Sequence, residues 1–308
     1  MGEILLEARG LSKGFPGVWE HLILDHLDFD VRAGEVHTLL GENGAGKTVI
    51  ANILSGYYDK TEGEVLIRGK PVNLTSPRDG LAHGIAMVHQ ELMLVPAFTV
   101  AQNVMVGLKA PAFSFGLAQV ERRLDELVVR YGLQVDPRAR VEDLSAGEQQ
   151  RVEILKVLFH EPQVLLLDEP TSLLTPGEAD QLFVVLRAMA DEGKGIVFIS
   201  HKMREVFAVS DRVTVLKLGK MQGTCHISET TEDELTRRTF GETVPDYMER
   251  PAVSSDAPAI EVRELVPKGL GSKAPATGMS FRLRRGEILG LAGVAGNGQT
   301  ELIEAITG

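Results

Sequence analysis

The chain has 308 residues, of which 44% are hydrophobic and 24% are charged, a composition close to that of an average globular protein with about two domains. A formal net charge of −11 without any block of lysine and arginine argues against a nucleic-acid partner, and the single Cys225 excludes an internal disulfide. The first residues lack a secretory signal pattern, and no apolar run approaches the roughly 18–20 residues of a membrane span, so a membrane role is expected to depend on a partner protein.

Short β-branched runs alternate with helical patterns, which predicts an α/β fold with a largely parallel sheet. Val36–Leu40 is predicted to be a strand that leads through a glycine-rich turn into a helix at Lys47–Ser55. The continuous apolar runs Val164–Leu167 and Ile196–Ile199 are typical of strands buried on both faces of a sheet. Cys225 is expected to be a strand-end residue without chemistry.

Helical signals are strongest in the middle of the chain. A helix is predicted to begin after Thr175, with Pro176 in its first position and Glu178 completing a capping box. Leu117–Tyr131 is amphipathic and stops at a glycine. The surrounding stretch, about residues 91–160, is therefore expected to be a mostly helical subdomain inserted into the sheet domain.

An internal repeat divides the chain. Residues 1–243 are predicted to form a first domain, and the proline- and serine-rich segment Val244–Pro258 is predicted to be a linker. Residues 259–308 restart the pattern, because Gly293–Thr300 repeats Gly41–Thr48 at an offset of 252 residues. The second copy stops after its first helix, so it is expected to be a degenerate fragment that cannot close a core of its own.

A phosphate-binding loop is predicted directly after the first strand. The glycines of such a loop turn backbone N–H groups toward phosphate oxygens at the start of a helix. Lys47 is expected to reach the β- and γ-phosphates of ATP, and the Thr48 hydroxyl to coordinate Mg²⁺. A glycine-rich structural turn is the alternative. The eight residues that match the pattern G-x-x-x-x-G-K-[ST] are Gly41, Glu42, Asn43, Gly44, Ala45, Gly46, Lys47 and Thr48.

Two acids follow the second apolar strand. A buried strand that ends in a carboxylate places it at the carboxyl edge of a parallel sheet, where ligands of such sheets bind. Asp168 suits Mg²⁺, directly or through water, and Glu169 suits a general base that polarises the attacking water. Taken alone, such acids more often mark a strand leaving the core; beside a phosphate-binding loop, the catalytic interpretation is favoured.

A third motif points to a family. Leu144–Gln150 reads L-S-A-G-E-Q-Q and opens a helix upstream of that strand. Here the chain resembles the ATP-binding cassette (ABC) ATPases, whose signature motif has the form L-S-x-G-x-Q. The resemblance implies a P-loop NTPase fold with a RecA-like parallel-sheet core, an antiparallel β subdomain and an inserted helical signature subdomain. It also implies that Ser145 and Gly147 close over the ATP of a second ABC cassette, or of the partner in a homodimer.

Further positions match the same family. Gln90, at the end of a predicted strand Ile85–His89, resembles the Q-loop glutamine that contacts Mg²⁺ and the membrane subunit. His201 resembles the switch histidine that contacts the γ-phosphate, although a lone histidine there is more often an ordinary strand-end residue.

One aromatic match and one departure complete the comparison. Phe15, upstream of the first repeat's sheet, resembles the aromatic residue that stacks on adenine, with plain packing as the alternative and Trp19 as the fallback. Thr175 stands where the family usually has an aspartate that connects the two nucleotide sites. Coupling between sites through that residue is therefore in doubt.

The second copy indicates the branch of the family. Tandem cassettes with Gln299 in place of the second lysine resemble the ATPases of simple-sugar and nucleoside importers, and the second site is expected to turn over poorly. The residues around Gln149–Lys156 and Phe198–Glu205 are closer to nucleoside-type members, with ribose, galactose and xylose types as the near alternative. The resemblance implies transmembrane permease partners, an indirect solute-binding protein and a peripheral position on the cytoplasmic face of the membrane.

Two other hypotheses stay open. One is a soluble ABC protein that acts on ribosomes or DNA, against which Gln299, the acidic charge and the linker composition argue. The other is an inert fragment that binds nucleotide but does not assemble, because the partial repeat supplies no signature motif.

Overall fold

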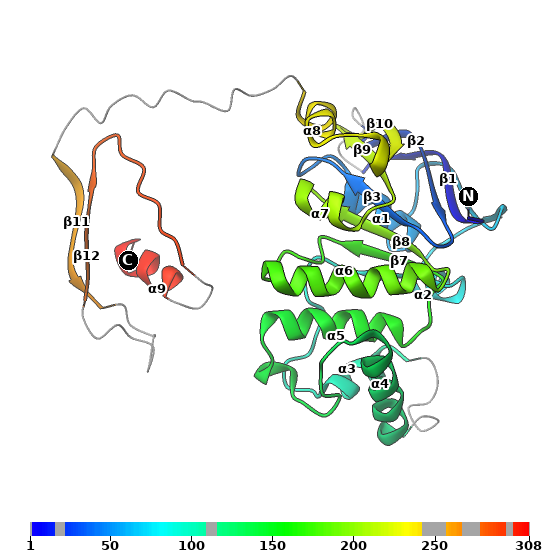
Figure 1. Cartoon of the computed structure of the whole chain (residues 1–308), viewed down its shortest axis with the longest axis horizontal. Helices are drawn as coiled ribbons and strands as arrows, with labels where there is room; N and C mark the ends of the chain where they lie inside the picture. Colours follow the sequence, from blue (N-terminus) through cyan, green and yellow to red (C-terminus); the bar gives the residue numbers. More distant parts are fainter. Residues whose placement is uncertain are drawn as a thin grey trace. The chain divides into compact units, whose positions relative to one another are not determined.

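The computed structural model describes residues 2–15, 22–108, 116–241, 257–266, 278–293 and 298–307. The chain divides into two compact units, residues 1–243 and 244–308 (Figure 1). Trp19 and most of the predicted linker lie outside the described residues. Pro258, the last residue of that predicted linker, instead begins a strand.

A six-stranded sheet forms the centre of the first unit. Its order is β10-β9-β3-β8-β7-β6, and all neighbours are parallel except β10 and β9. Strands β3, β7 and β8 are buried on both faces, as parallel strands usually are; β7 and β8 are mostly apolar, whereas β3 also buries His37 and Thr38. The strands are β3 (Val36–Leu40), β6 (Ile85–Val88), β7 (Val164–Asp168), β8 (Gly195–Ser200), β9 (Arg212–Lys217) and β10 (Lys220–His226).

A second sheet in this unit is antiparallel, with the order β2-β1-β4-β5. Its strands alternate buried and exposed residues over much of their length, so one face packs on the core and the other faces solvent. The strands are β1 (Ile4–Lys13), β2 (Leu24–Arg32), β4 (Glu62–Ile67) and β5 (Lys70–Val72). The expected α/β fold, with a parallel core and an antiparallel β subdomain, is confirmed.

Helices surround these sheets and also form a group of their own. Between β6 and β7 the chain forms α3, α4 and α5, which contact one another and gather at one end of the unit in Figure 1. Among the described residues, no helix is long and apolar enough to cross a membrane. The helices are α1 (Lys47–Leu54), α2 (Pro77–Ala82), α3 (Val100–Val106), α4 (Leu117–Tyr131), α5 (Ala146–Leu158), α6 (Pro176–Asp191), α7 (Met203–Val209) and α8 (Glu232–Phe240), with short 3₁₀ turns at Val141–Asp143 and Ile227–Glu229.

The two faces of the parallel sheet bury two separate clusters. Leu165 and Leu167 of β7 pack with α5 and α6, whereas Val164 and Leu166 pack with α1 and the antiparallel sheet. This division follows from the strand geometry, in which successive side chains point to opposite faces. Strand β3, which leads into the phosphate-binding loop, is packed from both sides in the same way, with Val36 in one cluster and Leu39 in the other.

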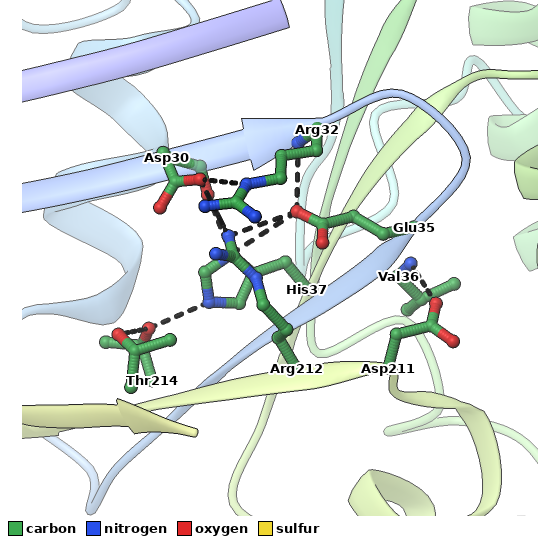
Figure 2. A network of polar contacts seen from close by, with 9 residues as sticks. Asp30, Arg32, Glu35, Val36, His37, Asp211, Arg212 and Thr214 are labelled. Carbon is green, nitrogen blue, oxygen red and sulfur yellow. Dashed lines mark hydrogen bonds and ion pairs between the residues drawn. The ribbon is translucent and has the colours of Figure 1, made fainter. Parts of the chain in front are cut away.

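A buried polar network joins the two sheets (Figure 2). The ring of His37 on β3 has its Nδ1 2.7 Å from the backbone carbonyl of Asp30 on β2 and its Nε2 2.8 Å from Thr214 Oγ1 on β9. Arg212 Nη2 donates to Asp30 Oδ2 at 2.9 Å and to Glu35 Oε1 at 3.1 Å. Burial, with the Arg212 charge beside it, lowers the pKa of His37 to about 3.

This network predicts a stability that falls in mild acid. His37 is neutral in the fold, while the unfolded chain binds a proton near the ordinary histidine pKa of about 6.5, so stability is lost as the pH falls from about 6.5 toward 3. Between pH 7 and pH 5 the expected loss is about 2 kcal/mol of the free energy of unfolding. Urea unfolding at the two pH values measures it.

A matched pair of variants isolates the share of His37. Burial also lowers the pKa of His89 and His160, whereas the hydrogen bond with Asp25 raises that of His26, so wild type alone sums contributions of both signs. His37→Asn is expected to show a pH dependence about 2 kcal/mol smaller than wild type. His83→Gln, at an exposed position, is expected to behave as wild type. An equal pH dependence in all three proteins would contradict the assignment.

The second unit repeats the first elements of the chain. Strands β11 (Pro258–Leu265) and β12 (Met279–Arg284) pair antiparallel, and α9 (Gln299–Thr307) falls on α1 at the offset of 252 residues. The segment that corresponds to β3 forms no strand, and Ile288 is 93% exposed. Among the described residues of this unit, no strand pairs with that segment, whereas β8 and β9 flank β3 in the first unit.

Candidate functional site

The predicted site residues follow three adjacent strand ends. In the parallel register Leu40 of β3 lies opposite Ser200 of β8, and Ile199 of β8 lies opposite Asp168 of β7. The residues that come next, Gly41 and His201 among them, therefore emerge at one edge of the sheet. This carboxyl edge is where open α/β sheets bind their ligands.

The phosphate-binding loop depends on its glycines. Gly44 and Gly46 have φ values of 82° and 105°, which residues with a Cβ rarely adopt. A Cβ on Gly46 would lie 2.6 Å from Leu24 Cδ2, and one on Gly41 would overlap the carbonyl oxygen of Leu216. The loop thus packs against the body of the unit and leads into α1 at Lys47, where a helix N-terminus favours anions.

Lys47 lies over its own loop. The side chain is buried, with the residue 6% exposed, and its Nζ donates to the carbonyl oxygens of Gly41 at 2.8 Å and Glu42 at 2.9 Å. Burial lowers the pKa of Lys47, and the neighbouring Glu169, Asp168 and Glu42 oppose that shift. Its ammonium is therefore held beside the loop backbone, close to two acids at the sheet edge.

Asp168 and Thr48 offer oxygen ligands. Asp168 is 1% exposed, and burial raises the pKa of its carboxyl, whereas a hydrogen bond with the Thr48 hydroxyl lowers it. Its Oδ1 is buried and has no hydrogen-bond partner. An unsatisfied carboxylate oxygen beside a hydroxyl fits Mg²⁺, which takes one or two protein oxygens and completes its shell with water and phosphate. Among the described residues no group of three or more His, Cys, Asp or Glu is placed to hold a metal by itself.

Glu169 and His201 lie in contact. His201 Nδ1 is 3.0 Å from Glu169 Oε1, and the two side chains are 39% and 15% exposed. Glu169 has a φ of 45°, a conformation that costs about 1–3 kcal/mol in a residue other than glycine and that clusters at functional sites. Its backbone N–H donates to the carbonyl of Ile199 at 3.1 Å. The structure therefore brings together the predicted base and the predicted switch histidine.

Gln90 and Phe15 lie at slightly different positions relative to the strands than the sequence predicts. Strand β6 ends at Val88, one residue before the predicted end, so Gln90 is the second residue after it and is exposed. Phe15 precedes all strands of the six-stranded sheet, but it follows β1 of the antiparallel sheet. Its ring packs on Tyr58 with centroids 5.5 Å apart, and Lys13 Nζ lies 4.8 Å from its centroid.

The signature residues Ser145 and Gly147 begin α5. Ser145 is the N-cap, and its hydroxyl and the Glu148 carboxylate complete a capping box. A Cβ on Gly147 would overlap the Glu178 carboxylate, so a larger residue here would require that side chain to move. Among the described residues, neither Ser145 nor Gly147 makes a hydrogen bond, ion pair or ring contact with residues 41–48 of the same chain.

The predicted cap at Thr175 is confirmed. Its hydroxyl and backbone N–H both donate to Glu178 Oε2, at 2.8 and 2.9 Å, and Pro176 is the first helical residue. Glu178 Oε1 also lies 3.7 Å from Arg151 of α5, and Figure 1 shows α5 and α6 side by side. The residue at the position where the family has an aspartate thus caps its own helix, and that cap touches the signature helix.

The second loop contains a neutral group at the lysine position. Gln299 begins α9, as Lys47 begins α1. A Cβ on Gly293 would overlap the Gln299 amide, so that amide lies over Gly293 much as the Lys47 ammonium lies over Gly41. Residues 294–297 of this loop lie outside the described part of the chain.

Sequence reasoning missed one residue near the site, Glu205. It is buried and contacts Thr171 and Ser200, which follow β7 and end β8. Its position four residues after His201, on a short helix, was the available signal, but spacing alone does not reveal a contact with Thr171.

Comparison with known proteins places this geometry in a family. Residues 24–172, which include the loop at Gly41–Thr48, the signature helix and both acids after β7, match the family described as ABC transporter. The chain belongs to the ABC transporter family. The expected family and fold are therefore confirmed.

Relatives of this ABC chain have import functions in their names. It is 43% identical to the ribose import ATP-binding protein RbsA 1 of Rubrobacter xylanophilus, covering 99% of this chain and 59% of the relative. It is 42% identical to the nucleoside import ATP-binding protein NupA of Lactococcus lactis, covering 92% and 56%. It is 41% identical to the glucose import ATP-binding protein TsgD13 of Haloferax volcanii, covering 99% and 60%. The chain thus spans little more than half the length of these relatives.

Solved ABC cassettes share the fold. A nucleotide-free ATP-binding cassette from an ABC transporter superimposes with a TM-score of 0.66 at 22% identity, over 76% of this chain and 94% of that one. CbiO1 of Clostridium perfringens, described as part of the ABC transporter complex cbiONQ, superimposes with a TM-score of 0.64 at 28% identity, over 77% and 94%.

Proposed function

We propose that this chain is the ATP-binding and ATP-hydrolysing subunit of an ABC importer that takes up nucleosides or simple sugars. The observation that carries the proposal is the convergence of Lys47, Asp168 and the Glu169–His201 pair at one sheet edge. Relatives with nucleoside, ribose and glucose names have identities of 42%, 43% and 41%, too similar to separate the two solute classes.

Each residue takes a part in hydrolysis. The loop N–H groups and the Lys47 ammonium bind the β- and γ-phosphates of ATP, and Thr48 and Asp168 would hold Mg²⁺. Mg²⁺ bound there would neutralise charge on the phosphate oxygens. Glu169 accepts a proton from the attacking water while the water oxygen forms a bond to the γ-phosphorus. The bond between the γ-phosphorus and the bridging oxygen breaks, and that oxygen leaves with ADP. His201, held against Glu169, is positioned to contact the γ-phosphate.

Purified full-length protein is expected to release phosphate from Mg-ATP with saturation kinetics. No release above the uncatalysed background, in the presence of its partner subunits, would contradict the proposed reaction.

A complete site needs a second cassette. Ser145 and the Gly147 region lie at a helix N-terminus, a location that favours a phosphate. In the proposed assembly they close over ATP on another cassette, either in a homodimer or in a tandem partner. The loop with Gln299 has no ammonium to face the phosphates, so it is proposed to serve as a weak binding or regulatory copy.

A groove next to Gln90 is proposed to receive the permease. A cavity of about 290 Å³ lies between β6, α3 and α5, and its lining includes His89, Met93 and Val106. Met93 and Val106 are 52% and 68% exposed, which leaves an apolar surface open beside the strand end that precedes Gln90. Such docking would hold the chain peripherally at the cytoplasmic face of the membrane, with a solute-binding protein acting only through the permease.

Charging this groove is expected to break the permease contact and leave the nucleotide site intact. Val106→Asp should lower co-purification with the permease at least about tenfold, because a carboxylate would be buried against an apolar partner. Val129→Asp is the matched control, since Val129 is 84% exposed on α4 and does not line the cavity. Equal co-purification of both variants would contradict the proposed docking surface.

A further inference from the structure

A buried carboxylate, that of Glu205, contacts the segments next to Glu169 and His201. Glu205 of α7 is only 7% exposed. Its two oxygens accept from Thr171 Oγ1 at 2.7 and 2.8 Å, and Oε2 also accepts from Ser200 Oγ at 2.9 Å. Lys202 Nζ lies 3.0 Å from Oε1. One side chain thus collects three donors.

These donors come from two different chain segments. Thr171 lies two residues after Glu169, in the segment that follows β7. Ser200 ends β8 and directly precedes His201. The Glu205 carboxylate therefore connects the segment that carries the predicted base with the segment that carries the predicted histidine.

The chemistry of the contact suits a carboxylate. Its two oxygens can accept from the Thr171 and Ser200 hydroxyls and from the Lys202 ammonium at the same time. Hydrogen bonds of this kind are stronger than neutral ones, and the Lys202 ammonium balances the buried charge. Lys202 Nζ also lies 3.3 Å from the Thr171 carbonyl, which adds a second link between the two segments.

Strands β7 and β8 are held together without the Glu205 contacts. Strands β7 and β8 already pair in parallel register from Val164↔Gly195 to Asp168↔Ile199. That ladder ends where the segments with Glu169 and His201 begin, so Glu205 adds a constraint at the end of β8 and beyond the end of β7. Misplacing catalytic groups by about 1 Å can cost on the order of 10²-fold in rate.

We propose that Glu205 is a positioning residue for ATP hydrolysis: it holds Glu169 and His201 in contact by tethering their segments to each other. The proposal rests on the proposed ATPase function. Replacing the carboxylate with an amide introduces an N–H among donors and removes one acceptor, so at least one tether is lost without a change in shape.

The experiment compares Glu205→Gln with Arg204→Gln in the full-length protein. Arg204 is the neighbouring residue on α7, and its guanidinium makes an exposed pair with Asp180. Glu205→Gln is expected to lower kcat for Mg-ATP at least about tenfold with KM within about threefold, while Arg204→Gln matches wild type. The NMR resonances of the His201 imidazole, recorded without nucleotide, are expected to move in Glu205→Gln only.

Ser200→Ala is a second test in case Glu205→Gln does not fold. It removes one of the hydrogen bonds to Glu205 and leaves the carboxylate paired with Thr171 and Lys202. It is expected to lower kcat several-fold with an unchanged KM. An unchanged kcat, a change confined to KM, or unmoved His201 resonances in a folded Glu205→Gln protein would overturn the proposal. If wild type releases no phosphate, the ATPase function fails, whereas moved His201 resonances would still support the positioning role.

Discussion

Glu169→Gln is expected to bind Mg-ATP as wild type does and to release phosphate about 10²–10⁴-fold more slowly. The amide keeps the size of the side chain and can still contact His201, whose Nδ1 lies 3.0 Å from Glu169 Oε1. It has no lone pair basic enough to take the proton of the attacking water. Phosphate release and equilibrium nucleotide binding, measured on the same preparation, separate the two effects.

A second glutamate provides the control. Glu232→Gln removes one negative charge at an exposed position in the first turn of α8 and is expected to leave both quantities unchanged. Sedimentation of Glu169→Gln with Mg-ATP is expected to show a dimer that persists because hydrolysis no longer opens it. Normal turnover by Glu169→Gln would remove Glu169 as the base, and a persistent monomer would favour an inert chain.

Lys47→Gln is expected to weaken ATP binding by about 10- to 100-fold. A hydrogen bond from a charged group contributes about 1.5–3 kcal/mol, and the amide cannot supply the charge that faces the phosphates. This change gives the first loop the residue that the second loop has at Gln299. Titration with a slowly hydrolysed ATP analogue measures the dissociation constant directly.

The matched control is Lys70→Gln, at an exposed position on β5. It removes the same charge far along the chain from the loop and is expected to bind as wild type. If Lys47→Gln bound the analogue as tightly as Lys70→Gln, the assignment of the ATP site to Gly41–Thr48 would be wrong. Equal weakening in both variants would point to net charge instead of a specific contact.

Much of the fold could be predicted because its signals are local. The apolar run at Val164–Leu167 indicates a strand buried on both faces, and Thr175 with Glu178 forms a cap within three residues. The meeting of the candidate residues at one sheet edge could also be predicted, because parallel strands bring their carboxyl ends together. The predicted strand ending at His89 was one residue too long, as is common at element boundaries.

Contacts between distant residues could not be predicted in the same way. Glu205 bonds to Thr171, 34 residues earlier, and His37 bonds to Thr214, 177 residues later. No periodicity signals such pairs, since they depend on the order of strands in the sheet. The approach of Glu178 to Gly147, 31 residues apart in the chain, is a contact of the same kind.

The most direct test of the account is phosphate release from Mg-ATP by the full-length protein, measured side by side for wild type and Lys47→Gln at a fixed ATP concentration near the wild-type KM. Release by wild type is expected to depend on Mg²⁺ and to fall at least about fivefold in Lys47→Gln, the fall that a tenfold weaker binding gives at this ATP concentration. Equal release by the two proteins, or release by wild type that is unaffected when Mg²⁺ is chelated, would contradict it.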